Sequence, residues 1–115
     1  MVAPRYVPER GDIVWLNFSP IRGHEQGGKR PALVISLSVY NEKTGLAIIC
    51  PVTSRAKGYD FEVALSNTSE IQGVVLSDHV RNLDWRARKA KFVERAPNIV
   101  VSQVAELVSI LVQSV

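Results

Sequence analysis

Cationic and hydroxyl side chains stand at the expected ends of two strands. Arg30 comes directly before one apolar segment and Thr53 directly follows another. A guanidinium fork and a hydroxyl held side by side suit a single phosphate group. The stretch HEQGGKRP adds His24 and Glu25 shortly before Arg30. So many polar groups at the mouth of a strand indicate a loop that meets a charged partner.

This set of residues could cleave RNA without a metal ion. The 2′-hydroxyl attacks the adjacent phosphorus and the 5′-oxygen leaves, which requires a proton acceptor and positive charge near the phosphorane. Glu25 is the candidate acceptor, with His24 as a helper. Arg30 would stabilise the developing charge, and Thr53 would orient a non-bridging oxygen. The same residues also admit a structural interpretation, in which Arg30 pairs with Glu25 or Asp78 and Thr53 caps a turn.

Other catalytic chemistries find little support in the sequence. The two histidines, His24 and His79, and the single cysteine, Cys50, are not arranged at metal-ligand spacing. The glycines around Lys29 lack the order of a phosphate-binding P-loop. No GxSxG nucleophile elbow is present. We therefore expect neither a metal site nor a cofactor.

Length and composition predict one domain over residues 1–115. A lone cysteine permits no intramolecular disulfide, which favours a reducing cytoplasm. The first residues lack the apolar core of a secretion signal. The segment 99–112 is too short to span a bilayer and is interrupted by polar residues. We expect a cytoplasmic protein with no membrane contact.

The positive charge is concentrated in one segment. The chain carries a net charge of +3, whereas residues 81–95 alone contain six cations and two acids, a net +4. Such a segment is typical of a protein that binds a polyanion. It is equally compatible with the solvated face of a strand.

Hydrophobic patterning predicts several short strands and one long helix. The apolar run 31–37 is typical of a strand buried on both faces, and 61–65 alternates like a half-buried strand. Residues 38–45 resemble a short helical turn or loop closed by Gly45, which is short enough to make the strands on either side neighbours. The expected strands are 11–18, 31–37, 46–52, 61–65 and 73–80, with a further, partly extended basic stretch ending near Glu94.

The segment after Pro97 has helical spacing. Its polar residues form a narrow stripe, and almost all other positions are apolar. Such a helix needs cover on more than one side, which a second subunit or a wide contact with the core could provide. The elements together predict an α+β protein, mostly antiparallel β, in the form of a small barrel with a C-terminal α-helix. The residues of the stripe are Asn98, Ser102, Gln103, Glu106, Ser109 and Gln113.

The order of motifs resembles the MazF/PemK toxins of bacterial toxin–antitoxin systems. The matching segments include ERGDIVWLNFSP, GHEQGGKRPALVIS, YNEKTGLAIICPVTS and GVVLSDHVRNLDWRAR. The resemblance implies a homodimer of SH3-like barrels. It also implies a sequence-specific endoribonuclease, independent of metal and ribosome, that cuts single-stranded mRNA at a short motif to leave a 2′,3′-cyclic phosphate and a 5′-hydroxyl. A cognate MazE-like antitoxin with an acidic flexible tail would neutralise it.

The resemblance also carries residue roles. By matching position, the catalytic arginine falls on Arg30, the catalytic threonine on Thr53 and the loop glutamate on Glu25. Some relatives place an arginine two residues before the position of Asp78, where this chain has Leu76. That departure favours Arg30 as the catalytic cation and leaves Asp78, like His24, an auxiliary role.

RNA recognition in such a protein is expected to combine stacking with phosphate contacts. Trp85 could stack on a base or could instead close the core, and Trp15 is expected to pack within a strand. The other candidates lie on the two polar loops and in the basic segment: Arg22, Lys29, Ser54, Lys57, Tyr59, Arg86 and Arg88.

Two other functions remain compatible with this fold. A related toxin could poison DNA gyrase through an aromatic C-terminus, but this chain ends LVQSV and has no aromatic residue after Phe92. A passive RNA-binding barrel would bind RNA without cutting it.

Overall fold

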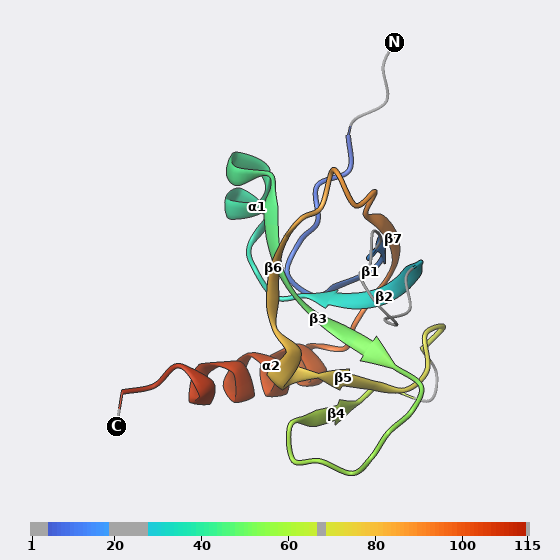
Figure 1. Cartoon of the computed structure of the whole chain (residues 1–115), viewed down its shortest axis with the longest axis vertical. Coiled ribbons are helices and arrows are strands. Elements are labelled where there is room, and N and C mark those ends of the chain that lie inside the picture. The colour runs from blue at the N-terminus through green and yellow to red at the C-terminus, as the bar shows by residue number, and fades with distance from the viewer. Residues whose placement is uncertain (1–4, 19–27, 67–68, 115) are drawn as a thin grey trace, which may run out of the picture.

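The structure is a computed structural model that describes residues 5–18, 28–66 and 69–114. The chain forms an antiparallel sheet that curves into a barrel-like body, with a helix packed against one side (Figure 1). This confirms the α+β, mostly antiparallel fold. The elements are β1 (Asp12–Asn17), β2 (Lys29–Val34), α1 (Ser38–Thr44), β3 (Leu46–Thr53), β4 (Glu62–Ala64), β5 (Val74–Leu76), the 3-10 turn η1 (Ser77–His79), β6 (Arg81–Asp84), β7 (Lys91–Arg95) and α2 (Asn98–Leu111).

The central strand β3 has neighbours on both edges. The strands follow the order β4-β5-β3-β2-β1-β7, and β6 also pairs with β3. Because β6 pairs with residues 46–49 and β5 with residues 52–53, the two strands lie one after the other along the same edge of β3. The predicted single strand 73–80 is therefore wrong in its second half. It ends at Leu76, and η1 follows, where Ser77 donates its backbone N–H to the carbonyl of Phe61 at 3.0 Å.

The sheet is covered on both faces, which explains the apolar run in β2. Leu33 points into the core that α2 covers, whereas Ala32 and Val34 point into a second core inside the barrel. Alternate residues of a strand face opposite sides, so both sides of this strand must be apolar. The predicted burial of this strand on both faces is confirmed, although it begins at Lys29 and ends at Val34.

Buried polar groups tie the N-terminal segment to the sheet. The carboxylate of Asp12 is 3% exposed and accepts a bond from Arg95 Nη1 on β7 at 2.7 Å. It also accepts the Tyr6 hydroxyl at 2.5 Å and the backbone N–H of Glu9 at 3.0 Å. Burial, followed by the bond to Asp12, raises the pKa of Tyr6 far above its usual value. This paired charge holds β1, β7 and the entering chain together.

A second polar cluster surrounds Asn41 on α1, which is completely buried. Its side-chain Nδ2 donates to the carbonyls of Pro8 and Ser36 at 2.8 and 3.1 Å, and its Oδ1 accepts the Ser36 hydroxyl at 2.5 Å. Its backbone carbonyl accepts the indole N–H of Trp85 at 2.8 Å. The Ser36 hydroxyl in turn accepts the N–H of Ile48 at 2.8 Å. The side chain of Asn41 therefore joins the N-terminal segment to the residues just after β2, its backbone carbonyl holds Trp85 after β6, and Ser36 extends the network to β3.

We expect Asn41→Ala to lower the free energy of unfolding by about 2–4 kcal/mol, because several buried partners lose their hydrogen bonds together. Chemical denaturation would measure the loss. Asn82→Ala is the matched control, since Asn82 is an exposed amide whose side chain donates to the Tyr40 hydroxyl at 2.8 Å. An equal and small effect of both substitutions would contradict this role of Asn41.

Candidate functional site

The pairing of β2 with β3 places Arg30 across from Thr53. Ala32 pairs with Pro51 in an antiparallel register. Two residues further along this register, Arg30 on β2 lies opposite Thr53, the last residue of β3. Directly opposite residues of an antiparallel pair project to the same face. The sequence-based expectation that these two residues share one edge of the barrel is met.

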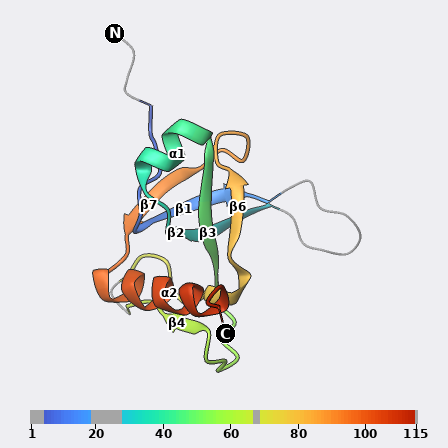
Figure 2. The ribbon, with the colours of Figure 1, turned by 90° about the vertical axis from the view of Figure 1, so that its left-hand side faces the viewer.

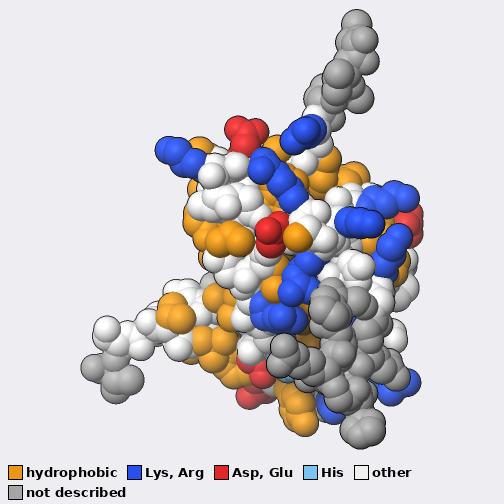
Figure 3. All heavy atoms as spheres, turned by 45° about the horizontal axis from the view of Figure 1, so that its top comes forward, with side chains coloured by type: hydrophobic (Ala, Val, Ile, Leu, Met, Phe, Trp, Pro, Cys, Tyr) orange, Lys and Arg blue, Asp and Glu red, His pale blue; other side chains and the backbone are white. Residues whose placement is uncertain are grey.

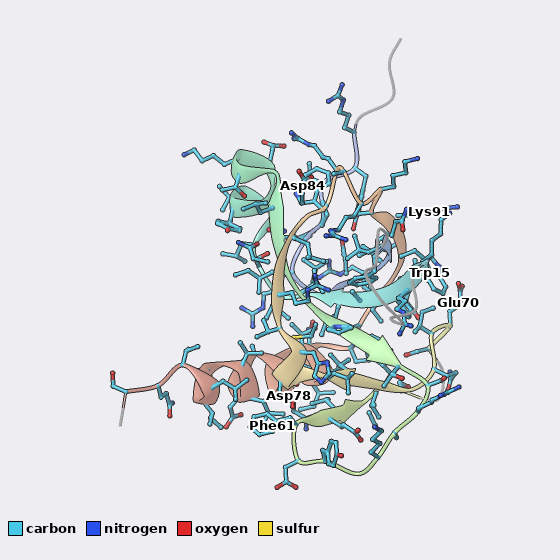
Figure 4. All side chains as sticks on the ribbon, viewed as in Figure 1. Trp15, Phe61, Glu70, Asp78, Asp84 and Lys91 are labelled. Carbon is cyan, nitrogen blue, oxygen red and sulfur yellow. The ribbon has the colours of Figure 1, made fainter. Side chains whose placement is uncertain are left out.

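Both side chains line an open pocket of about 710 Å³ at this edge. Three of its lining residues are cations, and Glu70 is the one carboxylate among the described lining residues. A concave site with excess positive charge suits a phosphate-bearing ligand. Figure 4 shows Trp15 and Glu70 on the same side of the molecule as this edge. The lining residues are Trp15, Lys29, Arg30, Pro31, Val52, Thr53, Ser54, Arg55, Glu70, Ile71 and Gln72.

The Thr53 hydroxyl accepts one hydrogen bond within the protein and can still donate another. Its Oγ1 accepts the backbone N–H of Arg55 at 3.1 Å, so it does cap the turn after β3. A hydroxyl can accept one bond and donate another. The turn therefore fixes the position of the oxygen, and its proton can still be donated to a phosphate oxygen. The structural and catalytic interpretations of Thr53 are compatible.

Gly73 brings the turn before β5 against Thr53. Its φ is +122°, and a Cβ built there would lie 2.1 Å from the carbonyl oxygen of Thr53. Val74, the next residue, pairs with Thr53. Only glycine permits this approach. This approach carries Glu70, Ile71 and Gln72 to the pocket, and none of the three was among the site residues predicted from the sequence.

The structure brings together some of the predicted site residues and separates others. Arg30, Thr53, Ser54 and Lys29 share the pocket, whereas Lys57 and Tyr59 lie exposed on the loop that follows. Lys57 and Gly58 donate their backbone N–H groups to the Glu62 carboxylate at 2.9–3.1 Å, which shapes that loop. Arg22, His24 and Glu25 lie outside the described residues.

Asp78 does not line the pocket. It belongs to η1, at the end of β5 opposite to Val74, and its side chain lies 3.9 Å from His79. Figure 4 shows it near α2, away from Trp15 and Glu70. Nearby Cys50 is buried, and this burial, with a smaller effect of Asp78, raises the pKa of its thiol to about 12. The geometry does not support Asp78 as a partner of Arg30.

The structure does not support the prediction that Trp85 stacks on an RNA base. Its side chain is only 6% exposed, its indole N–H is bonded to Asn41, and the guanidinium of Arg86 lies 4.8 Å from its ring centre. It closes the barrel core and does not offer its ring to a base. Arg88 lies beside the end of β1, where its Nη1 donates to the carbonyl of Asn17 at 3.3 Å.

Within the described ranges, no cluster of three or more histidine, cysteine or acidic side chains could hold a metal ion. In the same part of the chain, neither helix has the length and apolar character needed to cross a membrane.

Gly73→Ala is expected to lower the free energy of unfolding by about 2 kcal/mol or more, because the new methyl group collides with the backbone of Thr53. The displaced hydroxyl should also reduce any activity of the pocket. Gly58→Ala is the control: φ is +83° there, but no atom lies within 4 Å of the added Cβ. It should cost about 1 kcal/mol from backbone conformation alone. Denaturation curves that coincide for the two variants would exclude the close contact as the cause.

Comparison with known proteins agrees with this geometry. Residues 9–112 match the family of PemK-like, MazF-like toxins of type II toxin–antitoxin systems. The endoribonuclease toxin MazF of Escherichia coli K12 is 51% identical over 86 residues, covering 75% of this chain and 77% of that protein. The endoribonuclease toxin ChpB of the same strain is 41% identical over 100 residues, covering 83% and 85%.

Solved structures give the same result. A crystal structure of MazE–MazF from Deinococcus radiodurans superposes with a TM-score of 0.87 at 55% identity, covering 93% of this chain and 96% of that one. A mycobacterial endoribonuclease has the same fold at 14% identity, with a TM-score of 0.74 and coverage of 91% and 90%. The chain therefore belongs to the PemK- and MazF-like family of endoribonuclease toxins of type II toxin–antitoxin systems.

Proposed function

We propose that the pocket of Arg30 and Thr53 cleaves single-stranded mRNA at a short sequence motif, independently of the ribosome and of metal ions. The observation that carries this proposal is the pairing of β2 with β3, which brings a guanidinium and a hydroxyl to one cationic pocket. Family membership supplies the reaction class, and the pocket supplies the place for a phosphate.

The reaction begins with attack of the 2′-hydroxyl on the adjacent phosphorus. The bond from phosphorus to the 5′-oxygen breaks, and this oxygen takes up a proton from water. The products are a 2′,3′-cyclic phosphate and a 5′-hydroxyl. Arg30 stabilises the extra negative charge on the phosphorane, and Thr53 donates to a non-bridging oxygen. We do not assign Arg30 the role of a base, because an arginine guanidinium offers only hydrogen-bond donors.

Glu25 is proposed to take the proton from the 2′-hydroxyl, with His24 as its helper. Both belong to the segment that joins β1 to β2. The backbone N–H of Phe18 donates to the carbonyl of Gly28 at 3.0 Å, so this segment leaves and re-enters the barrel at neighbouring points. Gly28 lies two residues before Arg30, which puts the segment's return beside the pocket.

An antitoxin is the proposed protein partner. The Deinococcus toxin that superposes on this chain was crystallised with MazE. The lining cations Lys29, Arg30 and Arg55 outnumber the one carboxylate, Glu70. An acidic, flexible antitoxin tail would be attracted to the same charges that attract RNA. Neutralisation would then be competition for the pocket.

A homodimer is proposed from two apolar patches on one side of the molecule. Figure 2 shows α1 and α2 on the same face, and in Figure 1 the end of α2 projects beyond the sheet. Val100, Val101 and Val104 of α2 are buried within the chain, so a wide core contact explains most of its apolar surface. The apolar residues that stay exposed on and beside α1 and α2 are available to a second copy: Leu37, Val39, Ile99, Ile110, Leu111 and Val112.

Purified protein should cut a long RNA at one recurring motif, and the cutting should persist in EDTA. Arg30→Ala should lower the cleavage rate by about a hundredfold or more, because the phosphorane loses its closest positive charge. Primer extension on the digested RNA would report both the rate and the motif.

The matched control for this experiment is Arg10→Ala. Arg10 is an exposed arginine in the turn before β1, and its backbone carbonyl accepts a hydrogen bond from Arg95 at 3.1 Å. It removes the same charge from another place, so cleavage should stay near the wild-type rate. Normal cutting by a folded Arg30→Ala protein would show that the active site lies elsewhere.

The dimer proposal predicts that Leu111→Glu shifts the protein toward a monomer, because a charge would be buried in the interface. Light scattering coupled to size-exclusion chromatography would measure the mass. Tyr59→Glu places the same charge at another exposed large residue, on the loop before β4, and should leave the mass unchanged. A Leu111→Glu protein with wild-type mass would argue against this face.

A further inference from the structure

A second pocket lies at the turn between β6 and β7, and it shares no lining residue with the pocket of Arg30. Its volume is about 650 Å³. Tyr6, Val7, Trp85 and Ala90 give it an apolar floor, and three cations with one carboxylate surround it. Figure 3 shows Lys and Arg side chains gathered over this end of the molecule, with apolar side chains between them. The charged residues are Arg5, Glu42, Arg86 and Lys89.

Lys89 occupies an unusual backbone position. Its φ is +54°, and among the described residues it is the only non-glycine residue with positive φ. The turn fixes this conformation, since Lys89 N–H donates to the carbonyl of Arg86 at 3.1 Å and Ala90 N–H to that of Trp85 at 2.9 Å. Glycine would adopt it without steric cost. A lysine kept in a strained position at the edge of a pocket points to a use for its charge.

Arg86 offers a flat surface at the same pocket. Its guanidinium carbon lies 4.8 Å from the centre of the Trp85 ring, and Trp85 is itself held by its bond to Asn41. Arg86 is exposed, so the side of its guanidinium away from Trp85 is accessible. Unpaired RNA bases stack on arginine planes as they do on aromatic rings. The ring of Trp85 supports the guanidinium before any ligand arrives.

Lysine and arginine side chains lie between the pocket of Arg30 and the pocket at the β6–β7 turn. Trp15 on β1 pairs with Lys91 on β7, and a small hollow of about 420 Å³ is lined by Trp15, Lys29 and Lys91. Lys29 also lines the pocket of Arg30. Figure 4 shows Lys91 close to Trp15. The positive charge therefore leads from the Arg30 pocket towards the β6–β7 turn.

Arg88 continues this line of charge. Its guanidinium donates to the carbonyl of Asn17, and the backbone N–H of Asn17 donates to the carbonyl of Arg88 at 2.8 Å. Asn17 pairs with Lys29, and Lys89 follows Arg88 in the chain. Each step of the path is thus fixed by strand pairing or by a backbone hydrogen bond.

We propose that the pocket at the β6–β7 turn binds single-stranded RNA that flanks the cleavage motif, with Arg86 stacking on a base and Lys89 and Arg5 contacting phosphates. This inference rests on the proposed function, because it needs RNA in the Arg30 pocket. A run of phosphates can follow the line of cations from one pocket to the other, and the guanidinium of Arg86 offers a stacking surface that suits a base. The site is an anchor for long substrates and takes no part in the chemistry.

The test measures how much flanking RNA improves binding. One RNA contains the motif alone, and a second extends it by about ten nucleotides, a length that one small barrel can hold. A 2′-deoxy sugar at the scissile position blocks attack, so binding is read without cleavage. We expect the longer RNA to bind wild-type protein more tightly. Lys89→Gly should remove about twofold to fivefold of that advantage.

Lys89→Gly also separates binding from folding. It relieves the positive φ, so its melting temperature should equal or exceed that of the wild type. Cleavage of the RNA that contains the motif alone should be unchanged. A loss of the flank advantage in a protein at least as stable as the wild type would support the site. An unchanged flank advantage would overturn it.

Glu42→Gln gives a test of opposite sign. It removes the carboxylate of the pocket and should increase the flank advantage about twofold. Glu106→Gln on the exposed side of α2 changes the net charge by the same amount and should leave the advantage unaltered. Equal effects of the two substitutions would indicate general charge attraction and would refute a specific site. Absence of cleavage by the wild type would instead refute the proposed function, since the binding measurement does not depend on cutting.

Discussion

The buried amide of Asn41 is the constraint on which the arrangement of the site depends. It sits in the helix that connects β2 to β3, where its side chain is bonded to Ser36, just after β2. The Ser36 hydroxyl in turn accepts the backbone N–H of Ile48 on β3. These contacts hold the two strands in one register at this end of the pair. A slip of one residue would turn every side chain of β2 to the opposite face. The same register, continued to the other end of the two strands, brings Arg30 and Thr53 together.

The buried core and the charged edge that carries Arg30 and Thr53 occupy different parts of the sheet. Ala32, Leu33, Cys50 and Val75 are buried in the middle of the sheet, and α2 and the interior of the barrel exclude water from its two faces. The strand ends beyond them carry Arg30 and Thr53 into solvent-accessible space. Charges at this edge keep most of their hydration, so clustering them costs the fold little. Positive potential can then accumulate where a phosphate is to be held.

Local patterns were sufficient to predict much of this fold. The apolar run of β2, the helix closed by Gly45 and the helix after Pro97 follow from periodicity and capping, and all three are present. The juxtaposition of Arg30 and Thr53 required one more step, the short connection between their strands. The family resemblance added the reaction, which spacing alone leaves open among a nuclease, a gyrase poison and a passive binder.

What the sequence did not reveal depends on contacts between distant segments. Glu70 and Gln72 reach the pocket because Gly73 passes against the backbone of Thr53, and nothing in their own turn signals this approach. Trp85 resembles a surface aromatic in a basic stretch, yet its indole N–H is required by a carbonyl on α1. The positive φ of Lys89 follows from hydrogen bonds across its turn, not from its residue type.

The hydrogen bond between Phe18 and Gly28 has a consequence for how such toxins diverge. It continues the pairing of β1 with β2 by one residue, so the two strands are held together right up to the connecting segment. Substitutions, insertions or deletions between Phe18 and Gly28 therefore cost the folding energy of the body little. Residues there are constrained by what they contact and not by the stability of the barrel, so they can change on a scaffold that need not be rebuilt.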